Sequence, residues 1–184
     1  MHPRAGRQAL PEDLIDLDAL LGAYESRRPD MGDPAQRVTF GTSGHRGSSG
    51  DFAKAYVIAH EFGHHLQTLT GASAQVREAQ QRARGQAEAN RYSVALELQA
   101  DCYAGVWARN AALVSNGEVA LEPGDLEAGM KTAQAIGDDA LQSGAGRRVS
   151  PESFTHGSSA QRVEWLQRGY RSGDPAACDT FSGA

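Results

Sequence analysis

The chain has 184 residues, of which 40% are hydrophobic and 22% charged, and its formal net charge at pH 7 is −5. These values are typical of one globular domain with a hydrophobic core, and a negative chain without a Lys/Arg-rich block argues against a nucleic-acid-binding surface. No stretch approaches the roughly 20 apolar residues of a transmembrane helix, and the N-terminus lacks the apolar region of a signal peptide.

The first 50 residues are rich in Pro, Gly, Arg, Asp and Ser. One short helix is predicted over residues 11–25, because its leucines share a face: Leu14, Leu17, Leu20 and Leu21. Residues 41–50 contain four glycines and are predicted to form a loop. We therefore expect a largely irregular N-terminal segment.

From Asp51 onward, hydrophobic residues recur at three- and four-residue steps, which predicts a helix that ends near Leu69, before Gly71. The polar residues 74–90 are predicted to be a helical or partly mobile excursion. A second strong helix is predicted over residues 91–110.

A third helix is predicted from Gly124 to about Leu141, with Asp125 as its cap. A loop over residues 144–153 follows, and the last helix is expected from Ser158 to about Arg171. Convincing strands are few, so the predicted fold class is mainly α.

The first strong helix contains the pattern His-Glu-x-x-His as His60, Glu61 and His64. The two histidines lie one turn apart on one face, so both imidazoles can reach a single metal ion. Glu61 lies close enough to act on a metal-bound water. His65 points about 100° away around the helix and is not expected to be a ligand. The alternative is a core helix that contains histidines by chance.

The second strong helix offers a third ligand. Glu97 and Asp101 are four residues apart and share a face. Glu97 can complete the protein ligands of a zinc ion, and Asp101 can accept the outer N–H of a ligand histidine. The alternative is a solvated face that carries two ordinary charges.

Catalytic roles follow from this arrangement. Glu61 is predicted to be the general base that takes a proton from a zinc-activated water and passes it to the leaving amine. His156, in a loop before the last helix, is a candidate donor to the developing oxyanion. Its alternative is a loop histidine with a local hydrogen bond.

Cys102 and Cys178 are either two reduced, buried thiols or one disulfide that ties the C-terminal tail to a core helix.

From Gly50 to the C-terminus the chain resembles the bacterial neutral zinc metallopeptidase family. The matching segments are residues 50–61, 97–108, 154–159 and 173–181, together with Arg162. The resemblance implies a zincin-like, gluzincin-type helical core in which His60, His64 and Glu97 bind zinc, Glu61 is catalytic and Asp101 supports a ligand histidine. Both cysteines fall at positions that the family usually carries, which favours the disulfide.

Residues 1–49 instead resemble the extreme N-terminus of bacterial phosphoglucomutase, above all in Arg37-Val38-Thr39-Phe40-Gly41-Thr42-Ser43-Gly44-His45-Arg46-Gly47. The phosphorylated-serine segment and the Asp-rich magnesium loop of that enzyme are absent. This leader therefore cannot support mutase chemistry by itself. The sequence predicts two unrelated pieces joined near Ser49–Gly50: a leader over residues 1–49 and an N-terminally truncated metallopeptidase domain over residues 50–184.

The predicted function is zinc-dependent hydrolysis of peptide bonds in a peptide or protein substrate. One alternative is a folded zinc-binding module without turnover, because the junction displaces the upstream stretch expected to supply a substrate-pairing edge strand. The other is a phosphohexomutase fragment. Relatives in the family are often membrane-anchored, which suggests a membrane-associated or extracytoplasmic location, although no signal or transmembrane segment is recognised in this chain.

Overall fold

A computed structural model of the chain describes residues 49–117, 119, 121–122 and 124–182. The described residues all belong to one compact unit of the chain. Its described part is mainly helical and contains no strand, so the mainly α prediction is confirmed. The helix predicted over residues 11–25 and most of the predicted loop over residues 41–50 lie outside the described residues.

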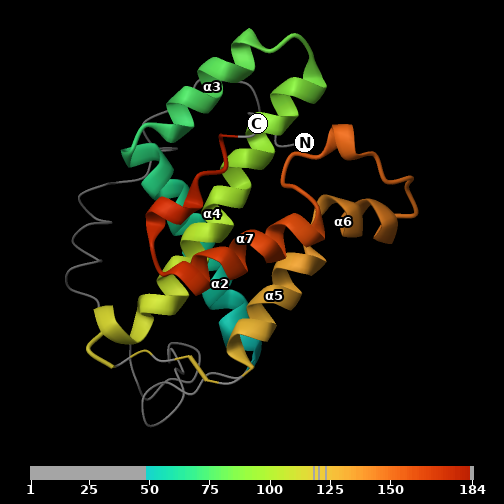
Figure 1. Ribbon diagram of the computed structural model, residues 1–184. Coiled ribbons are helices and arrows are strands. Elements are labelled where there is room, and N and C mark those ends of the chain that lie inside the picture. The colour runs from blue at the N-terminus through green and yellow to red at the C-terminus, as the bar shows by residue number, and fades with distance from the viewer. Residues whose placement is uncertain (1–48, 118, 120, 123, 183–184) are drawn as a thin grey trace, which may run out of the picture. The chain divides into compact units, whose positions relative to one another are not determined.

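Six helices and two 3-10 turns are described in this unit (Figure 1). In chain order they are α2 (Ser49–Leu69), α3 (Ala72–Arg82), α4 (Gln86–Val114), α5 (Asp125–Ala135), α6 (Asp138–Gly144), η2 (Pro151–Ser153), α7 (Ser159–Ser172) and η3 (Pro175–Cys178).

The predicted helices before residue 120 are present with wider limits. Ser49 and Gly50, expected at the end of a loop, already belong to α2, and Gly71 follows its end with a positive φ of 85°. The polar residues 74–90 are helical except at residues 83–85, which separate α3 from α4. Helix α4 therefore begins before and ends after the predicted range of residues 91–110.

The single helix predicted over residues 124–141 is wrong, because the chain breaks between α5 and α6. Gly137 is extended (φ −66°, ψ 145°), and the N–H of Asp138 donates to the carbonyl of Gly157 at 2.9 Å. A tertiary hydrogen bond thus replaces a helical one, which periodicity cannot reveal. Asp125 is also not the cap: Gly124 occupies that position, and the Asp125 carboxylate accepts from the N–H of Glu122 at 2.7 Å.

The last helix has strong local signals at both ends. The Ser158 side chain accepts from the N–H of Gln161, and the Gln161 side chain accepts from the N–H of Ser158, which forms a capping box. Gly173 ends α7 with a positive φ of 64°. The start and end of α7 therefore follow closely from its sequence.

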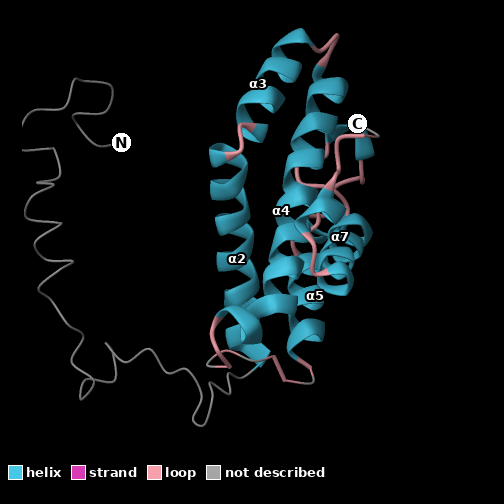
Figure 2. Ribbon diagram, turned by 60° about the vertical axis from the view of Figure 1, so that its left-hand side comes forward, coloured by secondary structure: helices cyan, strands magenta, loops and turns pink. Residues whose placement is uncertain are grey.

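The core lies where α2, α4, α5 and α7 meet. Its fully buried centre consists of Tyr56, Ala104, Ala133 and Leu166. Helix α4 runs beside α2, and α3 continues from the end of α2 (Figure 2). Helix α7 lies across the other side of α4 (Figure 1). Because α4 contacts both helices, its buried positions are mostly alanine and glycine.

The contact between α4 and α7 depends on two glycines. A Cβ atom at Gly105 would lie 2.1 Å from the carbonyl oxygen of Leu166, and one at Gly169 would lie 1.9 Å from that of Cys102. Both clashes involve backbone atoms, which cannot rotate away as a flexible side chain can. The two helices therefore pack backbone against backbone.

We expect Gly169→Ala to lower the free energy of unfolding by about 2–3 kcal/mol, because the helices must separate to admit the methyl group. For a chain of this size the melting temperature should fall by roughly 5–10 °C, measurable by calorimetry. Gly144→Ala is the matched control, since a Cβ there meets nothing within 4 Å. If Gly169→Ala and Gly144→Ala had the same melting temperature, the close contact between α4 and α7 would not be required for stability.

Candidate metal centre

The two helices that carry the candidate ligands approach closely at the motif itself. Gly63 is buried, and a Cβ built on it would lie 3.0 Å from the Cα of Ala100. Ala100 lies between Glu97 and Asp101 on α4, and Gly63 lies between the two histidines on α2. This contact between small residues therefore brings the acidic pair of α4 against the histidine pair of α2.

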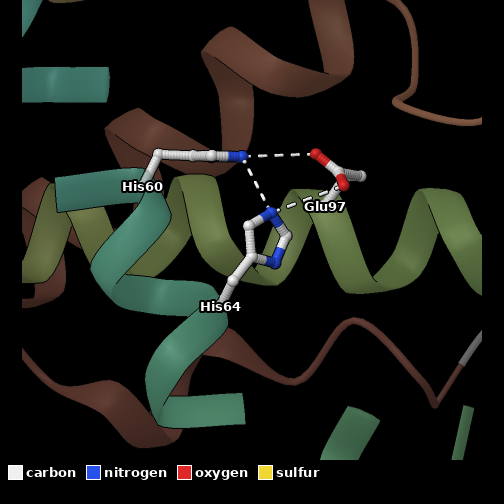
Figure 3. Close-up of side chains that lie close together, drawn as sticks. All are labelled: His60, His64 and Glu97. Carbon is white, nitrogen blue, oxygen red and sulfur yellow. Dashed lines mark hydrogen bonds and ion pairs between the residues drawn. The ribbon is translucent and has the colours of Figure 1, made fainter. Parts of the chain in front are cut away.

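The structure brings His60, His64 and Glu97 together in one cluster (Figure 3). The Nε2 atoms of the two histidines are 3.1 Å apart, and the Glu97 carboxylate oxygens lie 3.2 Å from Nε2 of His60 and 3.4 Å from Nε2 of His64. Four ligands placed tetrahedrally at 2.0–2.1 Å around a zinc ion lie about 3.3–3.4 Å from one another. Each of these distances is close to the separation that tetrahedral zinc requires, although a different oxygen of the Glu97 carboxylate faces each histidine.

The electrostatics of the cluster favour a charged carboxylate beside the histidines. Burial alone would raise the pKa of Glu97, but hydrogen bonds from His60 and His64 hold it well below its usual range. Burial lowers the pKa of His60, while its bonds to Asp101 and Glu97 outweigh burial and raise that pKa to about 9. Glu97 also raises the pKa of His64. A metal ion can bind these histidines only through nitrogen atoms that carry no proton.

Asp101 is fully buried and accepts hydrogen bonds from three side chains. Its Oδ1 lies 2.8 Å from Nδ1 of His60 and 2.6 Å from the hydroxyl of Tyr56. Arg162 donates to both carboxylate oxygens, through Nε at 2.9 Å and Nη2 at 3.0 Å. The bond to Nδ1 leaves Nε2 of His60 to face the cluster, which is the arrangement expected of a supported metal ligand.

Arg162 and Tyr56 complete this buried network. Arg162 also donates to the Tyr56 hydroxyl at 3.3 Å, and only 2% of its surface is exposed. Burial lowers the pKa of the guanidinium, but its bonds to Asp101 raise that pKa above its usual value. Burial and the Asp101 carboxylate raise the pKa of Tyr56. The tyrosine therefore stays a neutral donor and the arginine stays a cation.

The cluster opens onto a cleft of about 440 Å³. Its lining includes the three candidate ligands, Glu61 and His156, with an apolar rim of Val57, Ile136 and Leu141. Glu61 is exposed on α2. His65 lies outside the cluster, with its ring 5.7 Å from that of Phe62 on the exposed side of α2.

His156 comes to this cleft from the loop before α7, and Asp138 holds it there. Oδ2 of Asp138 accepts from the backbone N–H groups of Thr155, His156 and Gly157 at 2.7, 2.7 and 3.2 Å. Oδ1 of Asp138 lies 3.3 Å from Nδ1 of His156. About half of the imidazole is exposed. The loop is thus fixed by one carboxylate while the ring remains accessible from the cleft.

The two cysteines are joined in the structure. Cys102 on α4 and Cys178 in η3 form a disulfide across 76 residues. The bond fastens the C-terminal turn to the helix that carries Glu97 and Asp101. Of the two arrangements that the cysteines allowed, the structure has the bridged one.

Four residues of this site were given no role from the sequence: Tyr56, Gln67, Asp138 and Arg162. Tyr56 and Gln67 had a usable signal, because they lie four residues before His60 and three residues after His64, on the same helix. Arg162 was marked only as a position matched in the family resemblance, and Asp138 had no signal, since only the packing of α6 and α7 brings these two residues near the ligands.

The described residues form a helical scaffold with a candidate metal site made of two histidines and one glutamate. The chain belongs to the family described as "Putative neutral zinc metallopeptidase", whose sequence model matches residues 41–181. That match begins before the boundary predicted near residue 50. No solved structure matches the chain.

Two bacterial proteins illustrate what this chain is similar to. The uncharacterized protein YpfJ of Escherichia coli K12 is 56% identical over 135 residues, which cover 73% of this chain and 45% of the relative. The uncharacterized protein Rv2575 of Mycobacterium tuberculosis is 48% identical over 151 residues, which cover 79% of this chain and 48% of the relative. The chain thus spans about half the length of these relatives.

One shorter similarity is of a different kind. A phosphoglucomutase of Komagataeibacter xylinus is 57% identical over 49 residues, which are 27% of this chain and 9% of that enzyme.

None of the helices among the described residues is both long and apolar enough to cross a membrane.

Proposed function

We propose that this chain is a zinc-dependent peptidase of the gluzincin type, with His60, His64 and Glu97 as zinc ligands. The observation that carries the proposal is that the Nε2 atoms of both histidines and the Glu97 carboxylate converge beside one cleft, with nitrogen–nitrogen and nitrogen–oxygen distances of 3.1–3.4 Å. Two histidines and one carboxylate leave a fourth position free, as in catalytic zinc sites. Membership of the metallopeptidase family supports the same reaction.

Zinc bound here would supply Lewis acidity that polarises a peptide carbonyl and a water molecule. Glu61 lines the cleft without a place among the ligands, so its carboxylate is free to accept a proton from the attacking water and return it to the leaving amine. His156 donates a hydrogen bond to the carbonyl oxygen as negative charge develops. Asp101 holds the ring of His60 through Nδ1.

Zinc content tests the metal site. Protein purified without added zinc should contain about one zinc ion per chain by atomic emission, since the ligand set is complete. His60→Ala is expected to lose that zinc, while His65→Ala, on the same helix but outside the cluster, should retain it. The proposed metal site would be wrong if the unsubstituted chain contained no zinc, or if His60→Ala and His65→Ala contained equal amounts of zinc.

Turnover tests the reaction. The zinc-loaded chain is expected to cleave members of a quenched fluorescent peptide library, and a chelator should stop the cleavage. Full zinc content without any cleavage would instead identify a zinc-binding module. The experiment includes this alternative because the chain spans only about half the length of these relatives.

We also propose that residues 1–49 are a separate leader and that residues 50–184 form the peptidase domain. The 49-residue similarity to a phosphoglucomutase supports the first part, and the 135-residue similarity to YpfJ supports the second. The disulfide supports an extracytoplasmic location, because such bonds persist in oxidising compartments.

A further inference from the structure

The two candidate histidine ligands are held in different ways. His60 is supported by the charged Asp101, whereas Nδ1 of His64 lies 2.8 Å from Oε1 of Gln67. Gln67 is completely buried, and it lies three residues after His64 on α2. Nothing in the sequence or in the family resemblance assigned it a role.

The orientation of the Gln67 amide follows from its other neighbour. Its Nε2 lies 2.6 Å from the carbonyl oxygen of Leu96, which can only accept a hydrogen bond. The NH₂ group must therefore point to Leu96, and the amide oxygen points to His64. That oxygen accepts the Nδ1–H of His64, so Nε2, which faces Glu97 and His60, is the nitrogen that remains to bind a metal ion.

A second buried amide continues this chain of hydrogen bonds. Gln67 Nε2 donates to Oε1 of Gln99 at 3.1 Å, and Gln99 Nε2 donates to the carbonyl oxygen of Cys178 at 3.0 Å. The Cys178 carbonyl oxygen can also only accept a hydrogen bond. The Leu96 carbonyl therefore sets the orientation of the Gln67 amide, and the Cys178 carbonyl sets that of the Gln99 amide. The disulfide to Cys102 fastens that last carbonyl to α4.

We propose that Gln67 is a positioning residue that selects the metal-binding tautomer of His64, and that Gln99 and the Cys178 carbonyl hold Gln67 in place. This inference rests on the proposed zinc site. It makes the C-terminal turn, which is far from the ligands in sequence, a support of the metal centre.

Zinc affinity measured by competition with a chromophoric chelator tests the role of Gln67. Gln67→Met keeps the length of the side chain but removes the acceptor, and it is expected to weaken zinc binding by about 10–100-fold. Gln80→Met is the matched control: this glutamine bridges α3 to α4 through Ala89 and Ser93, and none of its hydrogen bonds reaches the site. The control should lose some thermal stability and keep its zinc affinity.

Two further variants separate positioning from general loss of structure. Gln67→Glu, as a buried protonated acid, retains an oxygen facing Nδ1 of His64 and a donor for the carbonyl oxygen of Leu96, so it should bind zinc more tightly than Gln67→Met. Gln99→Met removes the support but leaves the acceptor, and it should show a smaller loss of affinity than Gln67→Met.

Some outcomes contradict the inference. Equal zinc affinity of Gln67→Met and the unchanged chain would overturn the role of Gln67, as would equally weak binding by both Gln67 variants. Unchanged affinity in Gln99→Met would overturn the relay to the C-terminal turn. Absence of zinc from the unchanged chain is a different result, which contradicts the proposed function itself.

Discussion

Replacement of Glu61 by glutamine is expected to slow peptide hydrolysis by about 10²–10⁴-fold while the chain retains its zinc. A neutral amide cannot accept the proton of the attacking water, whereas the zinc ligands remain in place because Glu61 is not among them. Glu61 is exposed, so the fold should not depend on its charge. The measurements are kcat/KM on a cleaved peptide and zinc content of the same preparation.

Glu164→Gln is a suitable control for this variant, since Glu164 is exposed on α7 and does not line the cleft. It should match the unchanged chain in both measurements. If Glu61→Gln hydrolyses the peptide at the original rate, Glu61 is not the general base. If it loses zinc, its role lies in metal binding.

Replacement of Asp101 by asparagine should have the largest effect on stability. Removing the carboxylate charge leaves Arg162 buried without a counter-charge and weakens the support of His60. Breaking one partner of a buried ion pair costs about 3–5 kcal/mol. Urea denaturation of the metal-free protein is the direct measurement, because bound zinc would add its own stabilisation.

A double variant isolates the cause. In Asp101→Asn with Arg162→Met the buried cation is gone as well, so this chain should be more stable than Asp101→Asn alone. If Asp101→Asn lowered the free energy of unfolding by less than about 1 kcal/mol, the buried pair of Asp101 and Arg162 would not be required for folding. No recovery in the double variant would assign the loss to the bonds of Tyr56 and His60 instead.

Local patterns account for much of the helical structure. Apolar residues at three- and four-residue steps predict α2 and α4, and the Ser158–Gln161 capping box with Gly173 limits α7. These signals act within a few residues along the chain, so a sequence displays them directly. The break between α5 and α6 has no such signal, because it depends on a hydrogen bond from Asp138 to Gly157.

The sequence by itself determined the helical class and the donor types, because His60 and His64 share a face through spacing within one helix. It also placed Glu97 and Asp101 on one face of a second helix. Only the tertiary structure decided which faces meet. The close contact at Gly63 and Ala100 brings the two faces together, and the packing of α6 and α7 adds Asp138, His156 and Arg162. Such contacts join residues distant in sequence, and no local periodicity encodes them.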